Sequence, residues 1–266
     1  MRPLVLKLGG ELLESQAQRG AIAALAASVA GTRPLVLIHG GGRAIDAELA
    51  RRKIAPKKVD GLRVTDAATL EAVVAVLAGS ANTDLVSALV AADVRAVGLT
   101  GVDAAFGRAV RTAAHTATNG TVVDLGFVGD PVDADPALIG LLLKAKYVPV
   151  IASLGISVEA PGQVLNVNAD VMACRVATAI GDCELVIAGG TAGVLDAHGA
   201  SIPRLTLAGI ADVIANGTAT AGMVAKLASC STALAGGVSA IRLIDGRGLN
   251  GLHGVQDAPG TTLVVN

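Results

Sequence analysis

Two lysines stand alone in apolar segments of the chain. Lys7 lies inside the run 3–8 (PLVLKL), and Lys226 is the single cation of the segment 220–229 (TAGMVAKLAS). A buried ammonium group is costly unless an anion pairs with it. Both lysines are therefore candidates for binding an anionic ligand, and the structural alternative is a pairing with an acid of the chain itself.

Glycine-rich turns follow the first two apolar runs, in the segments 7–10 (KLGG) and 39–46 (HGGGRAID). Glycines let backbone N–H groups approach an anion closely, and the N-terminus of a helix adds positive partial charge. One such turn is more often structural, but two of them after consecutive strands, with Lys7 beside the first, favour a phosphate site. The glycines concerned are Gly9, Gly10, Gly41 and Gly42.

A third glycine turn, 190–196 (GTAGVLD), also follows an apolar run and contains Gly190 and Gly193. It is a further candidate nucleotide loop, and by itself it is equally well explained as a structural turn. The two commonest nucleotide fingerprints, the P-loop and strand–G-x-G-x-x-G–helix, do not occur in the sequence.

Polar residues cluster just before a predicted helix, in the segment 165–170 (LNVNAD). An N-cap explains one of Asn166, Asn168 and Asp170, because Asn and Asp favour that position, but it does not explain all three. Arg63, in the segment 61–66 (GLRVTD), has a side chain suited to bidentate capture of a carboxylate. Its alternative role is that of a solvated surface arginine.

No residue pattern indicates a metal centre or a histidine base. His39 precedes the triple glycine but has no nearby Ser or Asp in a triad arrangement, and H-x-x-x-H and C-x-x-C motifs do not occur. We therefore predict no metal site built by the protein. Cys174, Cys183 and Cys230 are scattered in apolar surroundings, which favours reduced thiols in a cytoplasmic protein.

Composition narrows the class of protein. The chain has 266 residues, a formal net charge of −1, 52% hydrophobic residues and 1% aromatic residues. The apolar fraction excludes intrinsic disorder, and the balanced charge argues against a general nucleic-acid binder. The apolar run 21–31 is too short to cross a membrane and 137–156 contains two lysines, so neither is expected to span one. An N-terminal strand with Lys7 inside it is also unlike a signal peptide.

Continuously apolar runs alternate with helical patterns along the chain. Such runs are typical of strands covered on both faces, and the alternation predicts a three-layer αβα sandwich around a mostly parallel sheet. We predict one domain, 1–266, with lobes 1–157 and 158–266 that meet near 155–165. The predicted strands are 3–8, 33–40, 94–101, 147–155, 183–190 and 239–246. The predicted helices are 17–30, 43–52, 67–78, 82–92, 135–145, 169–180, 207–216 and 222–235.

The motifs KLGG, HGGG, GLRVTD, VGLTGVD (97–103), LNVNAD and GMVAKL, in this order, resemble the amino acid kinase family. The resemblance runs from Leu4 to about Asp245. It implies a lobe 1–157 that binds the acid being phosphorylated and a lobe 158–266 that binds ATP with Mg²⁺. The motifs are most similar to members that phosphorylate the side-chain carboxylate of N-acetyl-L-glutamate, an early step of arginine biosynthesis.

The resemblance also implies residue roles. Lys7 and Lys226 would stabilise the transferring phosphoryl group, and Asp170 would orient them. An ionised carboxylate needs no general base, which agrees with the lack of a histidine base. The implied acceptor-binding residues are Gly41, Gly42, Arg63, Asn166 and Asn168. The implied nucleotide-binding residues are Gly9, Gly10, Gly190 and Gly193.

Two alternatives stay open at this level. Family members usually carry Thr/Ser-Asp where this chain has Gly189-Gly190, so a homologue that senses ligands without catalysis is one alternative. The other is a related kinase acting on aminoadipate or glutamate linked to a carrier protein, because a basic cluster could dock the carrier: Arg51, Arg52, Lys53, Lys57 and Lys58. The chain starts close to its first strand, so we expect a homodimer rather than the interlocked hexamer of arginine-inhibited relatives.

Overall fold

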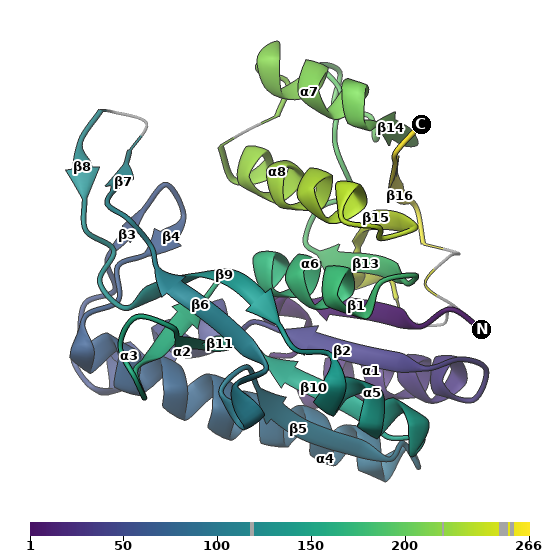
Figure 1. Cartoon of the computed structure of the whole chain (residues 1–266), viewed down its shortest axis with the longest axis horizontal. Helices are drawn as coiled ribbons and strands as arrows, with labels where there is room; N and C mark the ends of the chain where they lie inside the picture. The colour runs from purple at the N-terminus through teal and green to yellow at the C-terminus, as the bar shows by residue number, and fades with distance from the viewer. Residues whose placement is uncertain (118–119, 220, 250–254, 256–257) are drawn as a thin grey trace.

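The computed structural model describes residues 1–117, 120–219, 221–249, 255 and 258–266. Within them, an eight-stranded sheet forms the centre of the molecule, in the order β14-β16-β15-β13-β1-β2-β10-β5. Figure 1 shows helices on both sides of this sheet. The strands are β1 (Leu4–Leu8), β2 (Leu35–His39), β5 (Ala96–Thr100), β10 (Val148–Ala152), β13 (Glu184–Gly189), β14 (Arg204–Thr206), β15 (Ala240–Asp245) and β16 (Gly260–Val264).

The sheet is mostly parallel, and its order reverses at β1. β1 pairs in parallel with β2 on one side and with β13 on the other, so the earlier and the later strands of the chain extend in opposite directions from it. Only β15 and β16 pair antiparallel in the described part of this sheet. The crevice at the carboxyl ends of strands at such a reversal is where open α/β sheets bind ligands.

Each face of the sheet has its own apolar core. On one face, Val5, Ile38 and Ile187 pack against α6 (Ala169–Ile180) and α8 (Ala221–Ala235). On the other face, Leu6 and Leu37 pack against α1 (Gln16–Ala30) and α4 (Asn82–Ala91). This arrangement confirms the predicted three-layer αβα sandwich. The other α-helices of the described residues are α2 (Gly42–Arg51), α3 (Ala67–Val74), α5 (Ala137–Lys144) and α7 (Leu207–Ala215).

A smaller closed sheet lies beside the main one. Its strands follow the order β11-β12-β9-β6, and two short ribbons, β3–β4 and β7–β8, stand next to it (Figure 1). Much of the segment 104–130 belongs to this region. The strands are β3 (Lys58–Val59), β4 (Leu62–Arg63), β6 (Gly107–Arg111), β7 (His115–Thr116), β8 (Val122–Val123), β9 (Val128–Ala134), β11 (Leu154–Ser157) and β12 (Val164–Val167).

Three predicted elements, one strand and two helices, differ from the structure. The single strand expected over 147–155 is two strands, β10 and β11, which belong to different sheets. The two helices expected over 67–78 and 82–92 form one continuous helical stretch, because a π-helical segment (Ala75–Ala81) joins α3 to α4. Gly79 lies in that segment with non-helical backbone angles, so the chain bends there without ending the helix.

The same stretch, Ala67–Ala91, is long and apolar enough to cross a bilayer by length and composition. In the structure, Leu85 and Leu89 pack into the core under the main sheet, while Ala75, Ala78 and Val90 are exposed. One face of this helix is therefore a core face, and the other mixes small apolar side chains with exposed polar ones such as Glu71 and Asp84.

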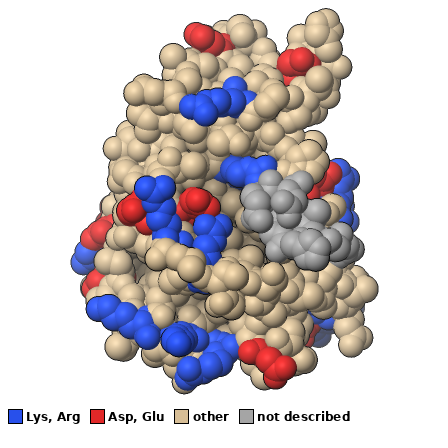
Figure 2. All heavy atoms as spheres, turned by 90° about the vertical axis from the view of Figure 1, so that its right-hand side faces the viewer, with Lys and Arg blue, Asp and Glu red and all other residues tan. Residues whose placement is uncertain are grey.

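Charged side chains of both signs are interspersed on the face shown in Figure 2, and most of that surface carries neither charge. This distribution agrees with the net charge of −1 and the charged content of 16%.

Candidate functional site

The reversal of strand order at β1 brings three glycine turns to one edge of the sheet. Gly9 and Gly10 follow β1, the turn 40–42 follows β2, and the turn 189–190 ends β13. These three strands are neighbours and parallel, so the turns must meet at their carboxyl ends. A cleft of about 280 Å³ opens there, lined by residues from β1, α2, the β3–β4 ribbon and the segment before α6.

Lys7 and Asp170 line the cleft, and the Asp170 carboxylate is shared by two lysines, Lys7 and Lys226. Lys7 Nζ lies 2.7 Å from Asp170 Oδ1, and Lys226 Nζ lies 2.9 Å from Asp170 Oδ2. The three side chains are 10%, 19% and 16% exposed in the order Lys7, Lys226 and Asp170. Burial would raise the pKa of Asp170, but the two lysines outweigh it and hold that pKa at about 2. The carboxylate is thus ionised and joins two cations from distant parts of the chain.

Asn168, rather than Asp170, caps helix α6. Its side-chain oxygen accepts hydrogen bonds from the backbone N–H groups of Asp170 and Val171. The capping alternative considered for the LNVNAD segment therefore applies to Asn168. It leaves the Asp170 carboxylate for the lysines and sets that carboxylate in the first turn of α6, where a negative charge is favourable.

The turn between β2 and α2 presents backbone N–H groups to the cleft. Gly41 is the N-cap of α2 and supplies no side-chain cap, so the first N–H groups of this ten-residue helix have no side-chain partner from the cap residue. A Cβ on Gly41 would lie 2.9 Å from Leu77 Cδ2, and one on Gly10 would lie 2.9 Å from Gly41 Cα. These close approaches explain why both positions are glycine.

His39, just before this turn, is fully buried. Its Nδ1 is 3.0 Å from the carbonyl oxygen of Gly40, and its Nε2 is 3.0 Å from Asn82 Nδ2. Neutral His39 with the proton on Nδ1 satisfies both contacts, as a donor to Gly40 and an acceptor from Asn82. Burial lowers the pKa of His39 to about 4, only partly offset by the Gly40 contact. His39 therefore holds the glycine turn against α4 and carries no charge at neutral pH.

The β3–β4 ribbon carries two cations into the cleft. Asp60 and Gly61 have positive φ angles of 48° and 83°, as in a type I′ hairpin turn, and this turn pairs Lys58 with Arg63. Asp46, on α2, lies between the two cations.

Asp46 Oδ1 is 2.6 Å from Arg63 Nη2, and Asp46 Oδ2 is 2.7 Å from Lys58 Nζ. Burial would raise the pKa of Asp46, but the two cations lower it overall. Arg63 Nη2 also donates to the carbonyl oxygen of Gly42, whereas the buried Nη1 has no hydrogen-bond partner among the described residues. Arg63 is thus held firmly at one nitrogen and has an unused donor at the other.

The remaining predicted residues do not all reach the cleft. Asn166 lines it and donates from Nδ2 to Thr65 Oγ1, 3.1 Å away. Gly190 lies near Glu11, since a Cβ on Gly190 would be 3.7 Å from Glu11 Oε1. Gly193 is buried elsewhere: it has a φ of +103°, and a Cβ there would meet Thr261 Oγ1. The backbone conformation and the crowding in this loop explain why position 193 is a glycine.

Sequence reasoning missed two residues that line the cleft, Glu11 and Lys58. It also missed Asp46 and Thr65, which contact the cleft residues Arg63 and Asn166. Lys58 was assigned to a docking cluster instead, and Asp46 was passed over although it stands within the HGGGRAID segment. The D-G turn before Arg63 was the available signal, because a two-residue hairpin turn places Lys58 opposite Arg63. Within the described residues, His, Cys, Asp and Glu side chains form no group of three that could hold a metal ion.

Comparisons with known proteins agree with one another. A model of the amino acid kinase family matches residues 2–245. An acetylglutamate kinase of Symbiobacterium thermophilum is 41% identical over 252 residues, covering 92% of this chain and 85% of the relative.

Two solved structures are also similar. A protein of Streptococcus mutans UA159, smu.665, has a TM-score of 0.79 at 28% identity over 99% of both chains. An N-acetylglutamate synthase of Neisseria gonorrhoeae, solved with coenzyme A and N-acetyl-glutamate, has a TM-score of 0.78 at 25% identity. The match covers 99% of this chain and 59% of the synthase.

Proposed function

The chain belongs to the amino acid kinase family, and from that premise we propose that it transfers the γ-phosphoryl group of ATP to the side-chain carboxylate of N-acetyl-L-glutamate. The observation that carries the proposal is the Lys7–Asp170–Lys226 group at the carboxyl end of β1. Two lysines and glycine-rich turns suit a reaction between two anions, in which the protein must neutralise charge and position the reactants.

The chemical step needs no proton transfer. A carboxylate oxygen of the acceptor attacks the γ-phosphorus, and the bond from that phosphorus to the β–γ bridging oxygen breaks. The products are ADP and an acyl phosphate, and the negative charge of the acceptor passes into the phosphate groups. Lys7 and Lys226 stabilise the equatorial oxygens and the leaving group as this charge moves, and Asp170 keeps the two ammonium groups apart from each other and in place.

The acceptor binds on the α2 and β3–β4 side of the cleft in this proposal. The free Nη1 donor of Arg63 and the ammonium group of Lys58 would bind the α-carboxylate, with Asp46 fixing both cations. The N–H groups of Gly41 and Gly42 would bind the carboxylate that is phosphorylated.

Two asparagines complete the acceptor site. Asn166 lines the cleft beside Thr65, where its side-chain oxygen can accept from the amide N–H of the acetylated amino group. Asn168 uses its side-chain oxygen for the cap, so its Nδ2 amide is the group that would donate to the acceptor. The neutral amide side chains of these asparagines suit an uncharged acylated amino group better than an acidic side chain would.

ATP binds across Gly10 and Gly190 in this proposal. Gly9 uses its own N–H for the carbonyl oxygen of Ala188, so it gives space to the phosphates rather than a donor. The donor set fits Mg²⁺ bound through ATP, since Mg²⁺ commonly takes phosphate oxygens, waters and one or two carboxylates, and Glu11 lies beside these glycines. When bound, Mg²⁺ neutralises part of the phosphate charge.

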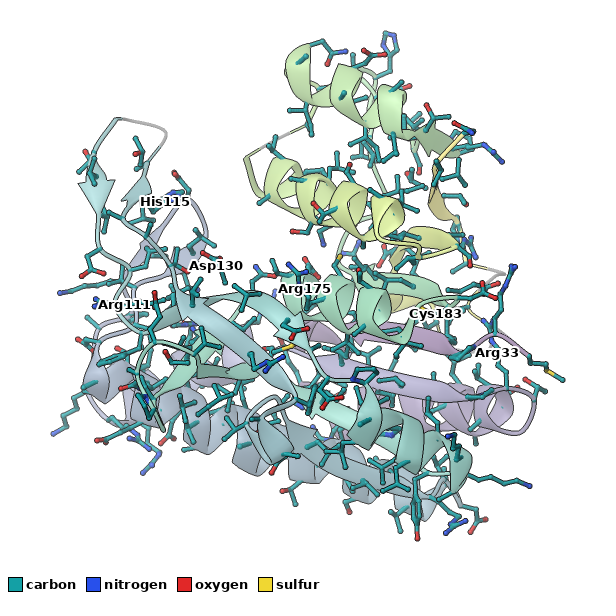
Figure 3. The ribbon with its side chains drawn as sticks, in the orientation of Figure 1. Arg33, Arg111, His115, Asp130, Arg175 and Cys183 are labelled. Carbon is teal, nitrogen blue, oxygen red and sulfur yellow. The ribbon has the colours of Figure 1, made fainter. Side chains whose placement is uncertain are left out.

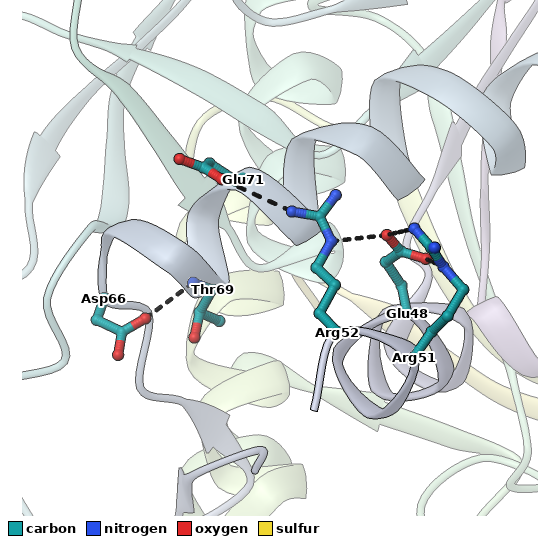
Figure 4. Close-up of polar contacts among 6 residues, drawn as sticks. All are labelled: Glu48, Arg51, Arg52, Asp66, Thr69 and Glu71. Atoms are coloured by element: carbon teal, nitrogen blue, oxygen red, sulfur yellow. Dashed lines mark hydrogen bonds and ion pairs between the residues drawn. The ribbon is translucent and has the colours of Figure 1, made fainter. Parts of the chain in front are cut away.

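The basic cluster is a weak candidate for docking a carrier protein, because most of its cations are paired. Glu48 binds both Arg51 and Arg52 (Figure 4), and Arg52 also lies 3.7 Å from Glu71. Lys58 turns toward Asp46 and the cleft. The small acceptor is therefore the better supported substrate.

We further propose that the chain works as a cytoplasmic homodimer with an acceptor lobe, 1–157, and a nucleotide lobe, 158–266. The reversal of strand order at β1, which separates the earlier strands from the later ones, supports the two lobes. The exposed face of Ala67–Ala91 supports the dimer, because the small side chains of Ala75 and Ala78 on it would allow two helices to pack closely. Sedimentation analysis of the wild type and of Ala78→Glu tests the dimer.

An ATP-dependent hydroxamate assay tests the function. Hydroxylamine traps the acyl phosphate, so purified protein with Mg²⁺ and ATP should form hydroxamate from N-acetyl-L-glutamate. Unacetylated glutamate and N-acetylaspartate, which is one methylene shorter, are the controls and should react far more slowly. Absence of hydroxamate with N-acetyl-L-glutamate, while the protein is folded, would reject the proposal and favour the ligand-sensing alternative.

A further inference from the structure

Helices α6 and α8 run side by side in the same direction, and two contacts fix their register. Asp170 of α6 meets Lys226 of α8, with 2.9 Å between the charged atoms. At the far end, a Cβ on Gly236 would lie 2.7 Å from Thr178 Cγ2. Figure 1 shows the two helices stacked next to each other beside the main sheet.

Between these two contacts, Cys174 faces Cys230. Each cysteine stands four residues after a member of the ion pair, Cys174 after Asp170 and Cys230 after Lys226, so the thiols lie one helical turn further along on the same faces. The register set by the Asp170–Lys226 pair places the two thiols opposite each other, and the nearby Cys174 thiol together with burial raises the pKa of Cys230. They are 4% and 0% exposed and carry no part of the proposed phosphoryl transfer.

A small cavity gives access to one of the two thiols. It has a volume of about 100 Å³ and lies between α6 and α8. Cys174 lines it together with Thr178, Ser229 and Thr232, whereas Cys230 does not. A hydroperoxide is small enough to reach Cys174 by this route, and Cys230 is positioned directly behind it.

We propose that Cys174 and Cys230 form a redox modification site, in which a hydroperoxide converts the thiol pair to a disulfide that restrains Lys226. The sulfur of Cys174 attacks the peroxide, the O–O bond breaks, and one water or alcohol leaves with formation of a sulfenic acid. The sulfur of Cys230 then displaces the hydroxyl as a second water, forming the S–S bond. The two thiols are oxidised by two electrons, and the peroxide is reduced.

The disulfide acts on the site through the shared helices, so this part of the inference rests on the proposed kinase function. An S–S bond is about 2.0 Å long, which is shorter than any non-bonded contact between two sulfur atoms, so its formation draws one turn of α8 toward α6. Lys226 is one turn away and must leave Asp170 at least in part to contact phosphate. Small displacements of a catalytic group are costly, so we expect turnover to fall roughly tenfold or more on oxidation.

The experiment treats the reduced full-length protein with hydrogen peroxide and then measures three properties. Peptide mass spectrometry under non-reducing conditions should find the Cys174–Cys230 disulfide. The melting temperature should rise by roughly 5–10 °C, because the bond closes a long loop. Hydroxamate formation should fall and then return when dithiothreitol is added.

The variants separate this pair from the third cysteine. Cys174→Ser and Cys230→Ala should each keep basal activity and lose both the peroxide response and the melting shift. Cys183→Ser is the matched control and should respond like the wild type. Cys183 is buried just past the end of α6, where its Sγ donates to the carbonyl oxygen of Ala177. Figure 3 labels Cys183 and also Arg175, which lies within α6 and marks the position of its neighbour Cys174.

The first two readouts need no enzymatic activity, so failure of this inference is distinct from failure of the kinase assignment. Lack of the Cys174–Cys230 disulfide after peroxide treatment would overturn the site. A disulfide that forms without a change in turnover would overturn its effect on Lys226. Peroxide inactivation that persists in both Cys174→Ser and Cys230→Ala would also overturn it, since the target would then lie elsewhere.

Discussion

Asp170 Oδ1 and Lys7 Nζ lie 2.7 Å apart, although one comes from the first strand of the chain and the other from a helix in its later half. The same carboxylate also holds Lys226. One carboxylate thus provides the counter-charge for two largely buried ammonium groups. The arrangement places both ammonium groups at the carboxyl ends of the central strands, where the glycine turns also meet.

Asp170→Asn should lower both activity and stability. The amide keeps the shape of the side chain but removes the counter-charge of two partly buried lysines, so kcat should fall by ~10²-fold and the free energy of unfolding by about 2–3 kcal/mol. Mg-ATP should restore part of the stability, because its phosphates supply negative charge. Kinetics and melting curves with and without Mg-ATP measure these effects, with exposed Asp84→Asn as control.

The stability difference between wild type and Asp170→Asn should also depend on pH. The pKa of Asp170 is lowered from 3.8 to about 2 in the folded protein, so the ionised carboxylate contributes its stability above pH 3.8. That contribution is lost as the pH falls through the window from 3.8 to about 2. Urea titrations across this range should show the two proteins converging, and a constant difference would contradict the assigned ion pairs.

Lys7→Ala and Lys226→Ala should each reduce kcat by ~10²–10³-fold, because each removes a charge contact to the transferring phosphoryl group. The fold should survive, since Asp170 keeps one lysine partner in either variant. Circular dichroism and steady-state kinetics check this, and Lys144→Ala, on the exposed end of α5, is the matched control. An unchanged kcat in either variant is incompatible with the proposed role.

Arg63→Lys should affect the acceptor and not the nucleotide. Lysine keeps the charge but lacks the second nitrogen, which in Arg63 is the donor left unpaired after contact with Asp46. We expect the KM for N-acetyl-L-glutamate to rise ~10-fold or more with little change in the KM for ATP. Arg43→Lys, at an exposed position on α2, should change neither. Damage confined to ATP binding would reverse the lobe assignment.

The central sheet and the lysine pair could be predicted from sequence, because continuous apolar strands and isolated cations in them leave direct signals. Lys7 inside an apolar strand required an anion, and Asp170 in the structure is that anion. Asp46 could not be assigned in this way, because an acid on an amphipathic helix looks like any solvated residue until Arg63 and Lys58 are placed beside it. Gly193 is the converse case, because its backbone conformation and the crowding around it account for a glycine there without any ligand.

The last prediction concerns His39, which is neutral and buried between Gly40 and Asn82. Burial lowers its pKa from 6.5 to about 4, so between these values the unfolded chain binds a proton that the folded protein excludes. Stability therefore rises with pH through this window, and wild type should lose up to about 3 kcal/mol between pH 6.5 and pH 4.

His39→Gln cannot titrate, so the stability of this variant should vary less over the same pH window. At pH 8 the variant should be less stable than wild type, because glutamine does not reproduce both ring contacts of His39. The KM for the acceptor should also rise, because His39 holds the carbonyl group of Gly40 and with it the turn that carries Gly41 and Gly42. His198→Gln, at an exposed position, is the control and should keep the wild-type slope. Denaturant titrations at several pH values decide the matter: equal slopes for His39→Gln and wild type between pH 6.5 and pH 4 would show that protonation of His39 does not oppose folding.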